Sequence, residues 1–575
     1  MCLMEGDDPV YARSWLLIGF VAAVLACAPP GDPDPAGGAI DLPSLDAVFS
    51  EFADPAGPGC AMAVSRDGQE VLSRAYGMAD LEWRIPNVPE TVFEPGSVSK
   101  QFTAAATMLL VIDGAISLDD DIRDYFPEIP DYGEPVTVRM LVNHTSGLRD
   151  WGSIAGIEGW RRWTRVHSHK HALDIVTRQQ ALNYEPGRYW SYTNSGYNLL
   201  AMLVERVTGM SFDGFSQERL FGPLGMTNTE WRDDFTEVVE NRAVGYSPGD
   251  DGEWHMDMPF ENVTGNGGLL TTVGDMLRFA RNLDTGEVGG GEFIRLMHEQ
   301  GILDSGRQLA YAGGIYVEEY RGLKEVHHSG GTAGYRGYLT RFPDHGVAIS
   351  IMCNDANASP RRLAHGVADL YLADAITQDE SGAAPATVEL EPELLAPLAG
   401  TYRDTRTGQP VEIATDGDHL SFGGDRLFAS SSSEFSSASG IEISFETVPM
   451  ADGRPAALMD SPVGDDVRLE PVADFEPTAR ELADYVGSYY SHEAEATYSI
   501  AADGGTLTIA NRYGEGPPGN AIRPLGPDRT LTPAYRDVFT RGLTTYIFRR
   551  DQAGRITGLS LSEARVWDLR FERTR

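Results

Sequence analysis

The chain has 575 residues, and at about 150 residues per domain this length predicts several domains. Its 85 Asp and Glu residues outnumber 46 Lys and Arg residues, and the net charge of -39 repels phosphate backbones and anionic lipid surfaces. We therefore expect no nucleic-acid partner. The acidic residues are spread along the chain, which favours a solvated surface over a specific cation site.

The N-terminus has the features of an export signal. An apolar run from Trp15 to Ala26 is followed by Cys27 and by a stretch rich in Pro, Gly and Asp. This run is too short to span a bilayer, which takes about 18 residues or more. The residues up to Cys27 resemble a bacterial lipoprotein cleavage box, which predicts lipidation of Cys27 and a lipid anchor. Ordinary signal cleavage is the alternative, and Pro29 just after the cut disfavours it.

Ser97 and Lys100 stand three positions apart at the predicted start of an apolar helix. Residues i and i+3 share a helix face, so the Lys100 amine can reach the Ser97 oxygen and take its proton. The segment 101–112 is rich in Ala and Leu and is followed by Gly114, as expected of a buried helix with a glycine stop. The pattern is weak by itself, because the start of a surface helix would also produce it.

Two later segments add candidate site residues. Tyr192 and Asn194 follow a Pro-Gly turn and precede an apolar helical run, which places Tyr192 on a loop at a helix entrance. His328 ends a short strand-like run, and the small residues Gly330 and Gly331 would let a substrate backbone lie against a strand edge. Taken singly, these residues also fit structural roles, as a packing tyrosine, a strand histidine and a turn glycine.

A histidine tract, His167, His169 and His171, has the alternation of some zinc-binding segments. No aspartate follows it in a metallo-hydrolase pattern, and the surrounding polar residues favour a solvated helix or loop. We therefore expect no metal and no other cofactor.

The chain changes character after about residue 375. A segment that contains Ser, Ala, Gly and Pro is predicted to be a linker, and the short alternating apolar segments after it indicate β-structure. A pattern around Tyr402 recurs without a gap 87 positions later, around Tyr489. Two tandem antiparallel barrels are the natural interpretation.

Together the motifs resemble the serine β-lactamase and penicillin-binding-protein superfamily, specifically the class C β-lactamase-like hydrolases with SxxK, YxN and HxG motifs. The resemblance covers roughly residues 45 to 357. A hydrolase domain followed by two barrels is also similar to the architecture of D-stereospecific aminopeptidases. Further segments that look like family landmarks are 143–148, 220–226 and 267–272 with Asp275.

The resemblance implies an α+β β-lactamase/transpeptidase-like domain, an antiparallel sheet flanked by helices, followed by two lipocalin-like all-β barrels. The predicted parts are a signal 1–27, a linker 28–44, the hydrolase domain 45–375, a linker 376–390, and barrels 391–473 and 474–575. In this fold type the first and last strands of the sheet are neighbours, so a bridge between Cys60 and Cys353 is conceivable. Two buried free thiols are the favoured interpretation, because Cys packs well as a small hydrophobe.

The resemblance also implies a role for each motif. Ser97 is the acylated nucleophile, and Lys100 and Tyr192 handle its proton. We expect these two groups to lower each other's pKa, and the identity of the working base stays open. Asn194 binds substrate, and backbone N–H groups of Ser97 and Gly331 form the oxyanion hole.

His328 stands where many relatives have lysine. This departure lowers the expectation of strong β-lactamase activity and points toward esterases and aminopeptidases. The implied function is a secreted serine hydrolase, periplasmic or at the cell surface, that acts through an acyl-enzyme on a D-amino-acid amide, a peptide or a small ester.

Carboxylesterase or weak β-lactamase activity is the alternative, and a penicillin-binding sensor or a catalytically silent scaffold is the alternative from another class. The presence of all the catalytic side chains favours the enzyme. The barrels act either as a spacer or cell-wall anchor or as a gate to the site. The partner is then a small-molecule or peptide substrate, and the oligomeric state stays open.

Overall fold

The computed structural model describes residues 41–52, 56–160, 165–377, 388–437, 440–450, 453–460, 466–512 and 529–574. From Leu42 onward these residues belong to one compact unit. The predicted signal with Cys27 and most of the linker 28–44 lie outside the described ranges. Within those ranges, no helix is both long and apolar enough to cross a membrane.

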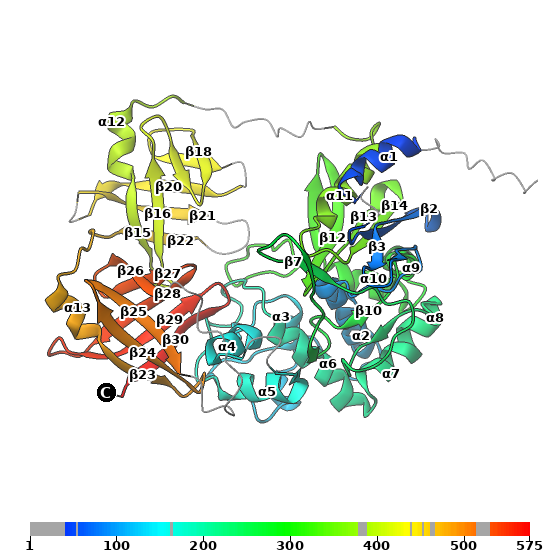
Figure 1. Ribbon diagram of the computed structural model, residues 1–575, viewed down its shortest axis with the longest axis horizontal. Coiled ribbons are helices and arrows are strands. Elements are labelled where there is room, and N and C mark those ends of the chain that lie inside the picture. Colours follow the sequence, from blue (N-terminus) through cyan, green and yellow to red (C-terminus); the bar gives the residue numbers. More distant parts are fainter. Residues whose placement is uncertain are drawn as a thin grey trace, which may run out of the picture. The chain divides into compact units, whose positions relative to one another are not determined.

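The N-terminal domain, residues 42–377, is built on a six-stranded antiparallel sheet (Figure 1). In sheet order the strands are β11 (Tyr316–Tyr320), β12 (Leu323–Thr332), β13 (Tyr335–Phe342), β14 (Val347–Cys353), β1 (Cys60–Arg66) and β2 (Gln69–Tyr76). β14 is buried along its whole length, as expected of a strand covered on both faces. Helix α9 (Val273–Thr285) packs on β1 and β14, and α11 (Pro360–Tyr371) packs on β13 and β14.

Helix α2 (Lys100–Ile112) is the central helix of this domain. Every residue from Lys100 to Leu110 is buried, and the helix packs against α6 (Asn194–Thr208) and α10 (Gly290–His298). A helix that is apolar nearly all round belongs in a core. A 3-10 helix, Gly96–Ser99, leads into α2, and Gly114 follows it with a positive φ of 70°.

The remaining elements of the domain are short or lie around this helical core. They are α1 (Leu42–Val48), α3 (Val138–Val142), α4 (Trp151–Glu158), α5 (His169–Arg178), α7 (Phe212–Ser216), α8 (Gly222–Leu224), and the strand pairs β3 (Met78–Asp80) with β4 (Ile85–Pro86), β5 (His167–Ser168) with β9 (Glu261–Asn262), β6 (Glu230–Trp231) with β10 (Leu269–Leu270), and β7 (Tyr246–Pro248) with β8 (Trp254–Met256).

Cys60 and Cys353 form a disulfide. They are directly opposite each other in the antiparallel register of β1 and β14. The interpretation of these cysteines as two free thiols was therefore wrong. The sequence pattern favoured burial, which is observed, but it did not fix the register that brings the two sulfur atoms together.

Two closed eight-stranded antiparallel barrels follow, as the predicted fold class requires (Figure 1). Barrel 1 consists of β15 (Gly400–Asp404), β16 (Pro410–Thr415), β17 (Leu420–Phe422), β18 (Asp425–Ala429), β19 (Glu434–Ser437), β20 (Glu442–Pro449), β21 (Pro455–Asp460) and β22 (Val467–Pro471), after a short helix α12 (Pro392–Leu395). Barrel 2 consists of β23 (Gly487–Ser491), β24 (Ala496–Asp503), β25 (Thr506–Arg512), β26 (Thr530–Tyr535), β27 (Val538–Arg541), β28 (Thr544–Arg550), β29 (Ile556–Glu563) and β30 (Val566–Arg573), after α13 (Ala479–Tyr485).

The internal repeat has a physical basis in two equivalent tyrosines. Tyr402 is buried and donates a hydrogen bond to the carbonyl of Leu398 over 2.9 Å. Tyr489, at the equivalent place in barrel 2, donates to the carbonyl of Tyr485 over 2.7 Å. Each phenol therefore ties the first strand of its barrel to the short helical segment before it. The two units repeat an internal contact as well as a sequence pattern.

The two barrels differ in how their cores relate to the N-terminal domain. The buried apolar residues of barrel 1 form a cluster of their own. Those of barrel 2, including Tyr498 and Phe571, form one continuous cluster with residues of the N-terminal domain such as Ile154. Barrel 2 is therefore part of the same packed core as the domain that carries the sequence motifs.

Candidate active site

Ser97 lies in the 3-10 helix Gly96–Ser99, at the point where β12 passes this turn. A Cβ on Gly330 would overlap the carbonyl oxygen of Pro95 and lie 2.6 Å from the Ser97 nitrogen. Glycine at position 330 therefore allows β12 to press against the turn that carries Ser97. Substrate contact for Gly330 stays a prediction, and the structure shows this packing role for it.

Gly331, the next residue of β12, lines the candidate cavity together with Ser97. A Cβ on Gly96 would lie 2.5 Å from the Gly331 nitrogen, so the two backbone segments nearly touch. The backbone N–H groups of Ser97 and Gly331 thus belong to adjacent segments at the cavity wall. This placement suits the predicted oxyanion hole, in which fixed donors stabilise charge that develops on a carbonyl oxygen.

The Lys100 amine is buried and surrounded by oxygen atoms. Its Nζ atom lies 3.1 Å from Ser97 Oγ, 2.9 Å from Asn194 Oδ1 and 2.7 Å from the carbonyl oxygen of Asn266. The amide and carbonyl oxygens can only accept hydrogen bonds. A neutral amine that donates its two hydrogens to them has its lone pair left for the hydroxyl of Ser97.

The environment favours this neutral amine. Burial lowers the pKa of Lys100 well below its usual range, Arg565 lowers the pKa further, and Asp150 opposes the shift. A buried amine whose pKa is lowered in this way can act as a general base toward the Ser97 hydroxyl.

Tyr192 lies beside this pair, on the loop before α6 as predicted. The Lys100 amine is 4.8 Å from the centroid of the Tyr192 ring. Burial raises the pKa of the Tyr192 phenol, and the nearby Ser97 hydroxyl opposes that shift only in part. The expectation that Lys100 and Tyr192 lower each other's pKa therefore fails, because the pKa of Tyr192 is raised and that of Lys100 is lowered by burial and by Arg565. The Tyr192 phenol stays protonated and can serve as a hydrogen donor.

Asn194 is the first residue of α6 and lines the cavity. Its backbone N–H donates to Asp150 Oδ2 over 2.7 Å, while its side-chain oxygen accepts from Lys100. Asp150 also caps helix α4 by accepting from the backbone N–H of Ser153. Asn194 is therefore held from both ends and fixes the position of the Lys100 amine.

His328 lies in β12, and its buried side chain is near the rings of Tyr192 and Tyr311. Its Nδ1 atom lies 2.6 Å from the carbonyl oxygen of Ser329. A carbonyl oxygen only accepts, so Nδ1 carries the proton, and the bare Nε2 atom accepts from the Tyr311 hydroxyl over 3.1 Å. Burial is the main cause that lowers the pKa of His328 to about 3. His328 is thus a neutral residue with both nitrogens occupied, and it is absent from the cavity wall. The prediction that it acts directly in catalysis is not supported by this placement.

The cavity beside Ser97 has a volume of about 300 Å³. Its wall includes Ser97, Asn194, Gly331, Glu261 and Arg565. Arg565 comes from the turn between β29 and β30 of barrel 2, so the barrel contributes a side chain to the candidate site. This finding favours the gating interpretation of barrel 2 over that of a spacer.

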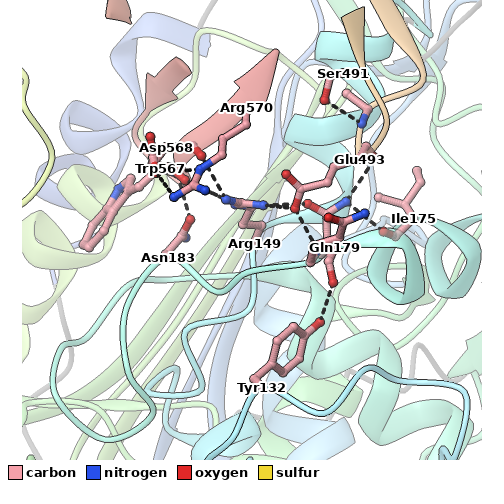
Figure 2. Close-up of polar contacts among 12 residues, drawn as sticks. Tyr132, Arg149, Ile175, Gln179, Asn183, Ser491, Glu493, Trp567, Asp568 and Arg570 are labelled. Atoms are coloured by element: carbon pink, nitrogen blue, oxygen red, sulfur yellow. Dashed lines mark hydrogen bonds and ion pairs between the residues drawn. The ribbon is translucent and has the colours of Figure 1, made fainter. Parts of the chain in front are cut away.

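A buried arginine joins barrel 2 to the N-terminal domain near this cavity. Arg149 forms a 2.6 Å ion pair with Glu493 and donates to the carbonyl oxygens of Trp567 and Asp568 (Figure 2). Gln179 shares the cluster, because its side-chain oxygen accepts from Arg149 over 3.1 Å. Arg149 is next to Asp150 in the chain, so the same segment holds barrel 2 and orders Asn194.

Two histidines of this region had no predicted role in the site. His144 is buried, packs with its ring centroid 4.3 Å from that of Tyr192, and accepts at Nδ1 from the backbone N–H of Thr193 over 3.3 Å. His167 is buried and lines the cavity, although we predicted a solvated segment there. The tract does not act as a unit, because His169 pairs with Thr264 and His171 caps α5.

Comparison with known proteins agrees with this geometry. Residues 45–373 match the profile of the Beta-lactamase family. The chain belongs to this β-lactamase family. It is a serine hydrolase of the family, with a penicillin-binding-protein-like domain and two appended barrels.

Relatives of this β-lactamase-family chain share nearly its full length. A D-aminopeptidase of Cereibacter sphaeroides (strain KD131 / KCTC 12085) is 28% identical over 538 residues, which are 91% of this chain and 97% of the relative. A D-aminopeptidase of Brucella ovis is 30% identical over 539 residues, with the same coverage of both chains. Among solved structures, the octameric penicillin-binding protein homologue from Pyrococcus abyssi is 25% identical, has a TM-score of 0.54, and matches 75% of this chain and 100% of its own.

Proposed function

We propose that this serine hydrolase hydrolyses D-amino-acid amides and removes the amino-terminal residue from peptides that begin with a D-amino acid. The proposal rests on the position of the Lys100 amine. Its Nζ atom is 3.1 Å from Ser97 Oγ and is hydrogen-bonded to two acceptor oxygens. The similarity to D-aminopeptidases supports the substrate class, because it extends over 91% of the chain and so includes the barrels as well as the hydrolase domain.

In the proposed reaction, neutral Lys100 takes the hydroxyl proton as Ser97 Oγ attacks the amide carbonyl carbon. The resulting oxyanion is stabilised by the backbone N–H groups of Ser97 and Gly331. The carbon–nitrogen bond then breaks as a proton passes from Lys100 to the leaving nitrogen, with the protonated Tyr192 phenol as a hydrogen-bond donor beside it. Water attacks the ester on Ser97 and Lys100 accepts the proton of that water. The bond between the acyl carbon and Ser97 Oγ then breaks, the D-amino acid leaves, and the proton returns to Ser97 Oγ.

A free α-ammonium group needs a negative partner, and Glu261 is the acidic residue among the described residues that line the cavity. We assign the substrate ammonium to this residue. Glu261→Gln is expected to raise KM for D-alanine p-nitroanilide by about 10-fold or more, since a charged hydrogen bond is lost. N-acetyl-D-alanine p-nitroanilide, which lacks the ammonium, is the matched control. An equal change for both substrates contradicts the assignment.

The function is tested by a substrate panel with the wild-type chain and Ser97→Ala. We expect turnover of D-alanine p-nitroanilide that exceeds turnover of its L enantiomer, of p-nitrophenyl acetate and of a chromogenic cephalosporin. Preferred turnover of the acetate would instead indicate a carboxylesterase, and preferred turnover of the cephalosporin a β-lactamase. Stable labelling by a fluorescent penicillin without turnover would indicate a sensor.

We also propose that the protein is exported and anchored through lipidated Cys27. The Cys60–Cys353 disulfide supports export, because disulfides persist in oxidising compartments such as the periplasm. Mass spectrometry of the mature chain isolated from membranes tests this proposal. A chain that begins with a lipid-modified Cys27 supports it, and a chain that retains residues 1–26 contradicts it.

A further inference from the structure

Arg565 brings a positive charge into the candidate active site. Its guanidinium is 5.0 Å from the centroid of the Tyr192 ring, and its side chain lines the cavity beside Ser97 and Asn194. Among the described residues of this wall, the other one with a charged side chain is Glu261, and His167 there has a pKa lowered to about 4 by burial. Within the described part of the chain, Arg565 has no ion-pair partner within 4.0 Å, although the chain carries an excess of 39 negative charges.

The hairpin turn that carries Arg565 is fixed to the N-terminal domain. The Arg565 carbonyl accepts from the backbone N–H of Asp150 over 3.3 Å and from Asn183 Nδ2 over 3.1 Å. Asn183 Oδ1 in turn accepts from the backbone N–H of Trp567 over 2.7 Å, and Arg149 holds the Trp567 carbonyl (Figure 2). The backbone on both sides of the turn is therefore pinned. A side chain whose backbone is held in this way can bind a ligand group at a defined position.

The position of Arg565 indicates which part of a substrate it can reach. In the proposed reaction the Tyr192 phenol lies beside the leaving nitrogen, and the Arg565 guanidinium lies over the Tyr192 ring. The guanidinium is thus on the side of the leaving group. His328 cannot supply a positive charge there, because it is neutral, buried and absent from the cavity wall.

We propose that Arg565 binds a carboxylate on the leaving group. The preferred substrates are then short peptides in which the part released from the D-amino acid ends in a free carboxylate. A guanidinium can hold a carboxylate with two parallel hydrogen bonds, which gives both affinity and orientation. With Glu261 for the α-ammonium group, the cavity has one partner for each end of a dipeptide. This inference rests on the proposed function and specifies its substrate.

Binding to a chain that cannot turn substrate over tests the inference directly. In the Ser97→Ala background, calorimetric titration at pH 7 compares D-alanyl-D-alanine with D-alanyl-D-alanine amide, which differ by the carboxylate. We expect the carboxylate form to bind about 10-fold tighter or more. Arg565→Gln in this background should make the two Kd values equal within about 2-fold, and Arg565→Lys should keep part of the preference.

Arg570→Gln is the matched control, because Arg570 lies on β30, the strand that follows the turn with Arg565, and its side chain is 64% exposed and pairs with Asp568. It should leave the preference intact. Three results would each overturn the inference. The two peptides bind the Ser97→Ala chain with equal affinity, neither peptide binds, or the preference for the carboxylate survives Arg565→Gln. Turnover of D-alanine p-nitroanilide, which has no carboxylate, reports separately on the proposed function.

Discussion

Arg149 and Glu493 form an ion pair of 2.6 Å between two buried side chains, one in the N-terminal domain and one in barrel 2. Arg149 also satisfies the carbonyl oxygens of Trp567 and Asp568, just after the turn that carries Arg565. One side chain therefore joins the barrel to the hydrolase domain and supports the placement of a cavity residue.

Arg149→Met should lower the free energy of unfolding by about 3–5 kcal/mol, because it leaves the Glu493 carboxylate buried without its partner. Denaturant unfolding measures this loss. Lys170→Met is the control, since Lys170 pairs with Asp174 at an exposed site, and it should cost less than about 1 kcal/mol. A loss for Arg149→Met as small as that of the control would show that the junction does not stabilise the chain.

Gly330→Ala should reduce kcat/KM by about 100-fold or more, which corresponds to about 2.7 kcal/mol in the barrier. The added methyl group would overlap the Pro95 carbonyl and displace the turn that carries Ser97. Steady-state kinetics with D-alanine p-nitroanilide measures the effect. Gly291→Ala provides the comparison, because a Cβ at that position of α10 meets nothing within 4 Å. Equal activity of the two variants would contradict the packing role of Gly330.

His328→Lys should destabilise the chain by about 2 kcal/mol or more, because it places an ammonium group in a buried aromatic site beside Lys100. We therefore expect no gain in the ratio of cephalosporin to ester turnover. Thermal unfolding and the two turnover rates measure these quantities. A stable variant with a raised cephalosporin ratio would show that position 328 does face the substrate.

Arg565→Gln should move the acid limb of the pH profile to higher pH. Lys100 acts as a base only when neutral, so kcat/KM falls as the pH drops below the pKa of Lys100. Burial and Arg565 lower that pKa and Asp150 raises it, and loss of the Arg565 charge raises it. Profiles measured with D-alanine p-nitroanilide should show this shift, whereas Arg565→Lys should keep the wild-type limb. An unmoved limb in Arg565→Gln would contradict the coupling.

The local parts of the site were predictable from the sequence. Ser97 and Lys100 are one helical turn apart, and Tyr192 precedes a strongly apolar helix, so spacing and periodicity placed them near a helix start and a helix entrance. The barrels were predictable because the repeat around Tyr402 and Tyr489 preserves an internal hydrogen bond. Short-range spacing and repeated patterns carry this kind of information.

The remaining features depend on tertiary packing. Arg565 is an ordinary turn residue of a hairpin, and its place beside Ser97 follows from the docking of barrel 2 through Arg149. The neutral state of His328 follows from its burial, and its contact with Tyr311 depends on packing that pattern reasoning did not connect to it. The Cys60–Cys353 disulfide required the register of β1 and β14. Residue type and spacing do not specify these long-range contacts.

The proposed mechanism requires that Ser97 becomes acylated by a D-amino-acid donor. Rapid quenching of the wild-type chain with D-alanine p-nitrophenyl ester, followed by peptide mass spectrometry, detects this acyl-enzyme. We expect a D-alanyl group on the peptide that contains Ser97, and no adduct in Ser97→Ala. Turnover without an adduct on that peptide would contradict the role of Ser97 as the nucleophile. So would turnover by Ser97→Ala within about tenfold of wild type, which corresponds to a barrier change of about 1.4 kcal/mol.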